Sequence, residues 1–193
     1  MRKVIVSMNI TLDGFMSGPH CELDWHFTRW SADMGESLAL ELSKTSILLL
    51  GRITYQAMAK YWPLRIVDRT TARGDLPFAL LVNDHKKLVY TNTLTELTWK
   101  NSQLLKGRVS EAIGALKKAG ENGTGDIMVY GSGQLVRALI KLDMVDEYQL
   151  WVHPVLLGEG KTLFHQHKIQ SDLQLTGSQL FESGVILLYY RKK

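Results

Sequence analysis

The stretch DIMVYGSGQLVRALIKL, residues 126–142, decides the fold class because it joins a short apolar run to a glycine turn and then to a helical pattern. Asp126 to Tyr130 predicts a buried strand, and two glycines end it. Leu135 and Leu139 then lie four residues apart, on one face of a helix. Strand, turn and helix in this order are typical of an α/β protein with a largely parallel sheet.

The rest of the chain repeats this pattern and then departs from it. We expect strands at residues 3–8, 47–50, 87–91, 147–152, 173–181 and 185–191, and helices at residues 33–44, 54–61, 109–116 and 134–142, with a further short helix from Pro77. A long loop is expected up to Ala32, helix ends are expected before Trp62-Pro63 and at Gly120, and residues 64–76 are expected to form a surface excursion. The consecutive final strands predict an antiparallel hairpin beside the parallel sheet, with helices on both faces, in one domain of residues 1–193.

Composition excludes several classes of function. The chain has 193 residues, a net charge of +4 and one cysteine, Cys21, so it forms no internal disulfide and no thiolate metal cluster. Its six histidines include no HExxH pair, and we expect no metal. The basic residues are scattered, which disfavours a nucleic-acid partner, and no apolar run is long enough for a membrane segment or a signal peptide. These features predict a cytoplasmic protein.

Two turns are candidate phosphate sites. Gly51-Arg52-Ile53-Thr54-Tyr55 follows one buried strand, and Gly131-Ser132-Gly133-Gln134 follows another. The free N–H groups and the dipole of a helix amino terminus favour a phosphate there. Each turn alone is also compatible with an ordinary helix start, whereas two of them in one sheet could hold a dinucleotide pyrophosphate.

Two better-known nucleotide motifs are incomplete. Gly131-x-Gly133-x-x-Val136 lacks the third glycine of the Rossmann fingerprint. Gly160-Lys161-Thr162 lacks the earlier glycine of a P-loop, because that position is Val155. An organic cofactor held in another way is therefore the better hypothesis.

Four segments carry a resemblance to a known family. They are Val4-Ile5-Val6-Ser7 with Thr11-Leu12-Asp13-Gly14, then Leu48-Leu49-Leu50-Gly51-Arg52-x-Thr54-Tyr55, then Val129-Tyr130-Gly131-Ser132-Gly133, and His153-Pro154-Val155-Leu156-Leu157-Gly158-x-Gly160-x-x-Leu163-Phe164. In this order they resemble the reductase branch, with the RibD C-terminal domain, of the dihydrofolate-reductase superfamily. The resemblance spans nearly the whole chain and implies the three-layer fold of that superfamily.

The resemblance also implies a cofactor site and a partner. NADPH would place its 2′-phosphate on Arg52 and its pyrophosphate on Thr54 and the turn that begins at Gly131. Gly51 belongs to the first of these turns. The list of implied cofactor-binding residues is completed by Ser132, Gly133 and Gln134 in the second turn, Thr91 and Asn92 beside the adenosine, and Asp13 in the loop near the nicotinamide. Members of this branch are commonly homodimers.

The implied reaction is hydride transfer from NADPH to a small heterocyclic or ribosylamino substrate. The closest named activity is 5-amino-6-(5-phosphoribosylamino)uracil reductase. The acidic residue that dihydrofolate reductases carry on the first helix has no exact counterpart here, and Asp33 and Glu36 are the candidates to position or protonate the substrate. Pterin reduction and a nucleotide-binding module without turnover are the alternatives.

Overall fold

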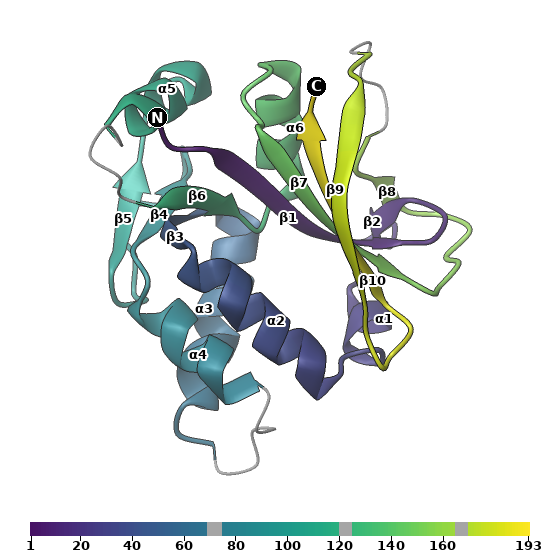
Figure 1. The fold of residues 1–193 in the computed structure, drawn as a ribbon. Coiled ribbons are helices and arrows are strands. Elements are labelled where there is room, and N and C mark those ends of the chain that lie inside the picture. Colours follow the sequence, from purple (N-terminus) through teal and green to yellow (C-terminus); the bar gives the residue numbers. More distant parts are fainter. Residues whose placement is uncertain (69–74, 120–124, 165–169) are drawn as a thin grey trace.

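The computed structural model of the chain describes residues 1–68, 75–119, 125–164 and 170–193. An eight-stranded sheet in the order β5-β4-β3-β6-β1-β7-β10-β9 runs through it (Figure 1). Its strands are β1 (Val4–Thr11), β3 (Thr45–Gly51), β4 (Lys87–Tyr90), β5 (Ser102–Leu105), β6 (Asp126–Val129), β7 (Glu147–His153), β9 (Leu173–Leu180) and β10 (Ile186–Lys192). The strands from β5 to β7 are parallel, and β10 pairs antiparallel with both β7 and β9. The predicted parallel sheet with its C-terminal antiparallel hairpin is confirmed.

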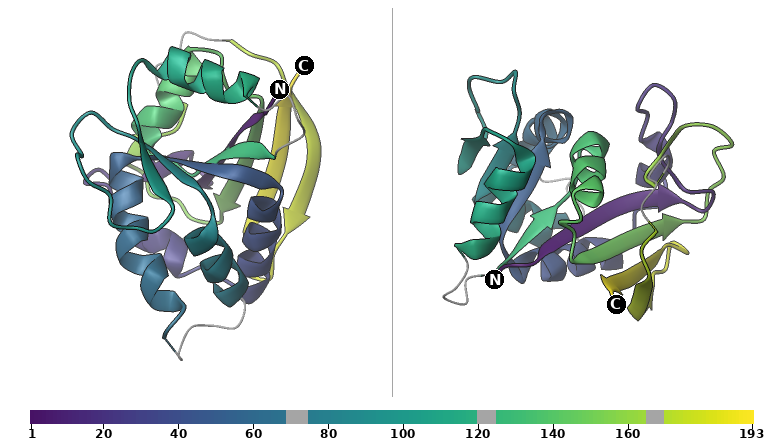
Figure 2. Two further views of the ribbon diagram at one scale, coloured as in Figure 1. Left: turned by 90° about the vertical axis from the view of Figure 1, so that its left-hand side faces the viewer. Right: turned by 90° about the horizontal axis from the view of Figure 1, so that it is seen from above.

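Helices cover both faces of the sheet, as predicted. Figure 2, left, shows α5 (Val109–Lys118) and α6 (Gly133–Lys141) on one side, and α2 (Ala32–Ser43), α3 (Arg52–Arg65) and α4 (Asp75–Asp84) on the other. Alternate residues of β3 explain the two layers, because side chains of a strand point to opposite faces. Leu49 packs in the cluster that contains α5 and α6 residues, whereas Leu48 and Leu50 pack in the cluster that contains α2, α3 and α4 residues.

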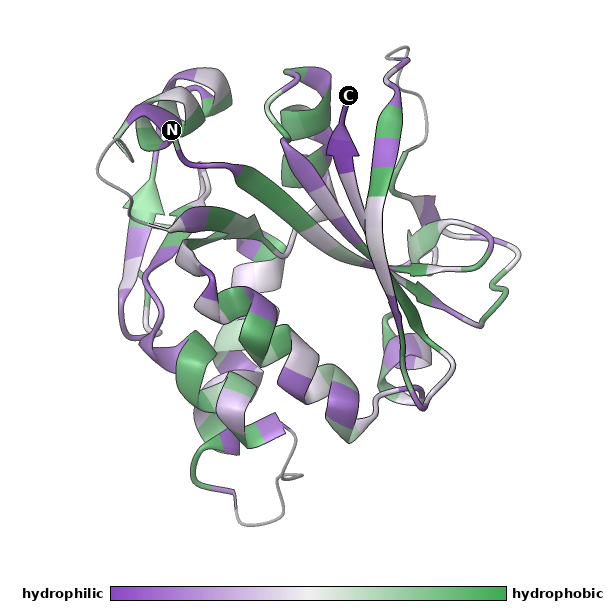
Figure 3. Ribbon diagram, viewed as in Figure 1, coloured by the Kyte–Doolittle hydropathy of each residue, from purple (hydrophilic) through white to green (hydrophobic). Residues whose placement is uncertain are grey.

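Hydropathy follows this layering. Figure 3 shows hydrophobic colouring along much of β1, in the middle of the sheet, and hydrophilic colouring at the end of β10. Val4 and Val6 of β1 are fully buried, whereas Arg191 near the chain end is exposed. Among the described helices, none has both the length and the apolar composition needed to cross a bilayer.

The structure corrects the prediction of one long loop up to Ala32. This segment contains β2 (Phe15–Ser17), which pairs with β8 (Lys161–Thr162) in a second small sheet, and the four-residue helix α1 (Asp24–Phe27). These elements and β5 are too short to give a periodic signal in the sequence.

The predicted end of α3 before Trp62-Pro63 is wrong, because the helix continues to Arg65. Pro63 has no N–H to donate to the carbonyl one turn earlier, so the helix loses one hydrogen bond there. The carbonyl of Trp62 accepts a hydrogen bond from Nδ2 of Asn83 at 2.9 Å, and the Trp62 ring packs on Phe78 with 4.7 Å between centroids. Tertiary contacts therefore hold the last turn of α3.

The remaining boundary predictions differ by a few residues. Within the predicted surface excursion of residues 64–76, residues 64–65 belong to α3 and residues 75–76 to α4. Residues 69–74 of that segment lie outside the described residues, as does the predicted helix stop at Gly120.

Candidate functional site

The carboxyl ends of four neighbouring parallel strands form the candidate site. In the order β3, β6, β1 and β7, these strands lead to Gly51, Gly131, Thr11 and His153. Parallel α/β sheets bind ligands at this edge, outside the carboxyl ends of their strands. Both glycine turns identified in the sequence lie here.

The two glycine turns touch each other. The backbone N–H of Gly51 donates to the carbonyl of Gly131 at 2.8 Å. A Cβ atom on Gly51 would lie 2.8 Å from the backbone N of Ser132, and one on Gly131 would lie 3.0 Å from Oγ1 of Thr54. Gly131 also has a φ of +109°, and the peptide bond that follows it is cis. We call residues 51–54 and 131–134 together the double glycine turn.

The double glycine turn presents two helix amino termini side by side. α3 begins after Gly51 and α6 begins after Ser132, and neither N-cap residue makes a side-chain capping hydrogen bond. The first N–H groups of a helix have no intrahelical partner, and the dipole adds positive potential there. Two such ends at the contact of two turns make this a candidate anion site, and its binding of a pyrophosphate stays a prediction.

Arg52 adds a cation to this anion site. Its side chain is exposed, and Nη1 donates to Oε1 of Gln56 at 3.3 Å, one helical turn further along α3. Such a long bond leaves the guanidinium able to turn toward a ligand. Gln134, in the other turn, is also exposed, whereas Thr54 is half-buried.

Met16 of β2 lies over the amino terminus of α6. A Cβ atom on Gly133 would collide with Met16, whose Sδ lies 2.5 Å from that position. The small sheet that carries Met16 is held to α6 by Arg137, since Nη2 donates to the carbonyl of Thr162 at 2.6 Å. A ligand on α6 therefore requires the flexible Met16 side chain to turn away.

Asp13 connects the loop after β1 to residues 157–158 through hydrogen bonds. Its carboxylate accepts hydrogen bonds from Thr11 Oγ1 at 2.5 Å and from the backbone N–H groups of Gly158 and Leu157 at 2.8 and 3.0 Å. The bond from Thr11, followed by that from Gly158, lowers the pKa of the Asp13 carboxyl below its usual value. Asp13 thus orders the loop at the end of β1, and direct contact with a nicotinamide stays a prediction.

The residues predicted to lie beside the adenosine follow β4, next to β3 in the sheet. Thr91 is buried, and its Oγ1 accepts hydrogen bonds from the N–H groups of Thr93 and Leu94 at 3.1 and 3.2 Å. Asn92 is exposed. Thr91 therefore stabilises the turn, whereas Asn92 has the exposed side chain of the pair, and contact of either with an adenosine stays a prediction.

The acidic residues of α2 have different surroundings. Asp33 accepts hydrogen bonds from Ser31 Oγ and from the N–H groups of Met34 and Glu182, both at 3.0 Å, which tie α2 to the β9–β10 turn. Partial burial works to raise the pKa of Asp33, but these hydrogen bonds outweigh it and the pKa lies below its usual value. Glu36 is exposed, whereas Glu41 is buried and bonded to Gln149.

Sequence reasoning missed a cluster at the ends of β1 and β7. Nε2 of His153 donates to Oδ1 of Asn9 at 2.8 Å, and the ring centroids of Trp25 and His26 lie 5.1 and 6.2 Å from that of His153. Burial, followed by the nearby His26, lowers the pKa of His153 to about 4. His153 is the first residue of the fourth segment that carries the family resemblance, so the sequence contained a signal for it. Asn9 and Trp25 belong to none of the four segments.

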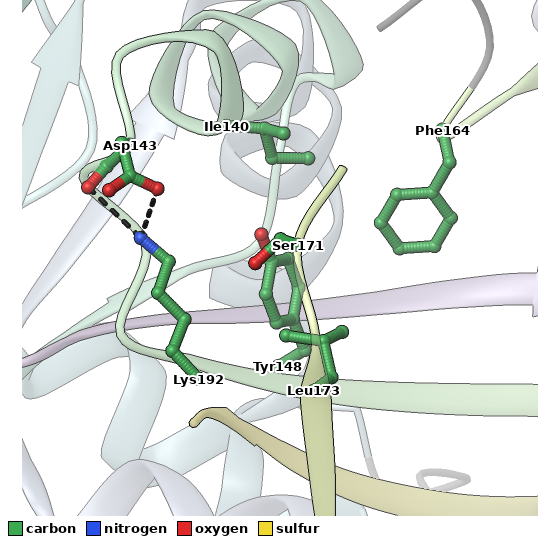
Figure 4. A pocket seen from close by; sticks show the side chains of 7 residues that line it. All are labelled: Ile140, Asp143, Tyr148, Phe164, Ser171, Leu173 and Lys192. Atoms are coloured by element: carbon green, nitrogen blue, oxygen red, sulfur yellow. Dashed lines mark hydrogen bonds and ion pairs between the residues drawn. The ribbon is translucent and has the colours of Figure 1, made fainter. Parts of the chain in front are cut away.

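A separate pocket lies at the other end of β7. Its volume is about 130 Å³, and Figure 4 shows Tyr148, Phe164 and the ion pair between Asp143 and Lys192 in its lining. Tyr148 is the second residue of β7, whereas the glycine turns and His153 lie at the carboxyl ends of their strands. The pocket is thus remote from the candidate site. Among the described residues, no three His, Cys, Asp or Glu side chains are grouped to hold a metal ion.

Comparison with known families agrees with this geometry. The model of the RibD C-terminal domain matches residues 2–187. The chain therefore belongs to the RibD C-terminal domain family, as the resemblance predicted.

Individual relatives cover the whole chain. The uncharacterized protein YyaP of Bacillus subtilis (strain 168) is 33% identical over 189 residues, which are 98% of this chain and 94% of YyaP. A solved putative riboflavin biosynthesis protein from Shewanella sp. PV-4 has a TM-score of 0.73 at 22% identity and covers 100% of this chain and 99% of its own. Acinetobacter baumannii RibD has a TM-score of 0.71 at 15% identity, and the match covers 100% of this chain and 58% of RibD. The structural matches establish the fold.

Proposed function

We propose that this protein is an NADPH-dependent oxidoreductase that reduces a small heterocyclic or ribosylamino compound. The observation that carries the proposal is the double glycine turn, in which Gly51 N–H bonds to the Gly131 carbonyl and two uncapped helix amino termini lie together. Family membership supports the same conclusion, because the resemblance to the reductase branch of this superfamily implies reduction. The closest named activity is 5-amino-6-(5-phosphoribosylamino)uracil reductase.

The residues present fit NADPH. The helix amino termini after Gly51 and Ser132 would hold the pyrophosphate, with Thr54 beside them. Arg52 would bind the 2′-phosphate with its planar set of N–H donors. The bound nicotinamide supplies the hydride, and the protein supplies orientation and electrostatics.

The substrate end of the site would lie further along the sheet edge, at β1 and β7. His153, Asn9 and Trp25 are gathered there, next to the loop that Asp13 fastens. These groups exclude water and orient a ring. A proton for the substrate would come from Asp33, Glu36 or solvent.

A turnover assay tests the proposal. NADPH oxidation is followed by absorbance with 5-amino-6-(5-phosphoribosylamino)uracil, dihydrofolate and other pterins as substrates. We expect turnover with the aminouracil compound above the rate without substrate. Turnover with pterins alone would favour the dihydrofolate reductase alternative, and NADPH binding without turnover on any of them would favour a non-catalytic nucleotide-binding module.

The proposed proton donors give a separate prediction. The Glu36→Gln and Asp33→Asn variants should differ, because Asp33 already receives three hydrogen bonds that favour its ionised form, whereas Glu36 is exposed. Loss of a proton donor lowers kcat about 10²- to 10⁴-fold. We expect such a loss, with little change in NADPH affinity, in one of the two variants. Unchanged turnover in both would remove the role from these residues and leave solvent as the donor.

Assembly and location are also proposals. A homodimer is what family resemblance implies, and β9 offers a surface for it. This strand lies at the sheet edge and has no charged residue from Leu173 to Leu180, and Leu175 and Leu180 are 51% and 71% exposed. Uncharged edge strands are templates for pairing with a second chain. A cytoplasmic location stays a prediction.

A further inference from the structure

Two buried ring nitrogens at the candidate site have no hydrogen-bond partner among the described residues. They are Nε1 of Trp25 and Nδ1 of His153. His153 is fully buried and Trp25 is 9% exposed, and their rings meet edge to face, with planes 88° apart. Buried polar atoms without a partner are few in native proteins, and each calls for an explanation such as a bound water, an ion or a functional role. Two of them on neighbouring rings, with centroids 5.1 Å apart, point to a ligand-binding role.

The two nitrogens differ in chemistry. The indole Nε1 of Trp25 can only donate a hydrogen bond. Since Oδ1 of Asn9 accepts from Nε2 of His153, Nε2 carries the proton and Nδ1 is an acceptor. The low pKa of His153, about 4, leaves the ring uncharged near neutral pH. The pair therefore offers one donor and one acceptor without a charge.

Access to these atoms depends on α1, which carries Trp25. This helix has four residues, its N-cap residue Leu23 makes no side-chain capping bond, and Phe27 is 56% exposed. The His26 ring bonds to the carbonyl of Leu23, within the same segment. Short segments with exposed surface open locally at low free energy. We expect an outward shift of α1, which carries Trp25, to admit a ring beside His153.

We propose that Trp25 and His153 determine substrate specificity by binding the lactam edge of a neutral heterocycle, a ring carbonyl next to a ring N–H. Trp25 donates to the carbonyl oxygen, and Nδ1 of His153 accepts from the N–H. An ionised carboxylate has no proton for Nδ1 and does not match. This assignment rests on the proposed function, because it places the substrate ring next to the cofactor site.

The test compares the binding of two small uracil derivatives as probes. 5,6-Diaminouracil has the lactam edge, whereas 1,3-dimethyl-5,6-diaminouracil keeps both carbonyls and has lost both ring N–H groups. Binding of each is measured by NMR titration, with and without NADP⁺. We expect the wild-type protein to bind diaminouracil at least about tenfold more tightly, since a hydrogen bond and a steric fit are lost together.

Variants assign the preference to the two residues. Trp25→Phe and His153→Phe should each weaken diaminouracil binding about three- to tenfold. His153→Phe removes an acceptor that the dimethyl compound cannot use, so this variant should leave the weak binding of the dimethyl compound unchanged. Trp99→Phe and His85→Phe are matched controls, because Trp99 Nε1 donates to Asn83 at 2.7 Å within the core cluster beside β3 and β4, and His85 Nε2 lies 3.2 Å from Thr45 Oγ1. Neither control should change diaminouracil affinity.

The outcomes separate this inference from the proposed function. NADPH titration of each variant shows whether that variant is folded. If His153→Phe does not fold, Trp25→Phe alone tests the inference. Equal affinity for the two uracils, or an affinity for diaminouracil that survives Trp25→Phe, would overturn the inference while NADPH binding and the proposed function stand. A wild-type protein that does not bind NADPH would overturn the proposed function, whatever the uracils do.

Discussion

Replacing Arg52 with alanine should remove the preference of the protein for NADPH over NADH. Two charge-assisted hydrogen bonds to the 2′-phosphate are worth about 1.5 to 3 kcal/mol each. Because Arg52 is exposed, screening by solvent reduces the sum to roughly 2 to 3 kcal/mol, a preference of about 30- to 150-fold. NADH lacks this phosphate, so the loss should fall on NADPH alone. Fluorescence titration of both cofactors measures it.

Two further variants sharpen the Arg52 experiment. Arg52→Lys keeps the charge without the planar donor set, and we expect an intermediate preference. Arg108→Ala is a matched control, because Arg108 is an exposed arginine that precedes α5 and pairs with Glu111. A preference that is unchanged in Arg52→Ala would show that Arg52 is only a surface residue of the turn.

Replacing Gly51 with alanine should weaken NADPH and NADH by a similar factor. The new Cβ would lie 2.8 Å from the backbone N of Ser132 and would also collide with its Oγ, so the two turns must move apart. Overpacking of this kind costs about 1 to 3 kcal/mol. If the same free energy is lost from pyrophosphate binding, the affinity for each cofactor falls roughly 5- to 150-fold. Titration of both cofactors and a denaturant melt measure the two effects.

The control for this variant is Gly114→Ala in α5. A Cβ on Gly114 meets nothing within 4 Å, and alanine is the better helix former. We expect Gly114→Ala to keep both affinities and to raise the free energy of unfolding slightly. Cofactor affinities that remain at wild-type values in Gly51→Ala would mean that the contact between the turns is not part of the cofactor site.

The fold could be predicted because its main elements have strong local patterns. Leu48 to Leu50 form a continuous apolar run before a glycine, which is typical of a strand buried on both faces. The same reasoning missed β5 and β8, which have only four and two residues. It also ended α3 too early, because tertiary contacts keep Pro63 within the helix. Local patterns do not report such contacts.

The site could be predicted in part. Glycines at the ends of two strands indicated that the turns around Gly51 and Gly131 share one edge of the sheet, and in the structure these turns touch. The contact between Asn9 and His153 joins residues 144 positions apart, and neither the spacing nor the composition of the chain predicts it.

The hydrogen bonds of the acidic residues could not be predicted from the sequence either. Asp13 and Asp33 were candidates because of their position in a motif and at a helix start. In the structure each carboxylate accepts backbone N–H bonds from a distant segment, Asp13 from residues 157–158 and Asp33 from Glu182. Such bonds form only when the chain is folded, so a sequence cannot show that these carboxylates already have partners.

The most direct test of the proposed cofactor site is an NMR titration with NADPH of the wild-type protein, labelled with ¹⁵N and with ¹³C in its methionine methyl groups. We expect saturable binding, with the largest shifts at the backbone amides of Gly51, Arg52 and residues 131–134, and a separate response of the Met16 methyl group as it leaves Gly133. Absence of saturable binding, or shifts confined to residues outside the double glycine turn, would contradict it.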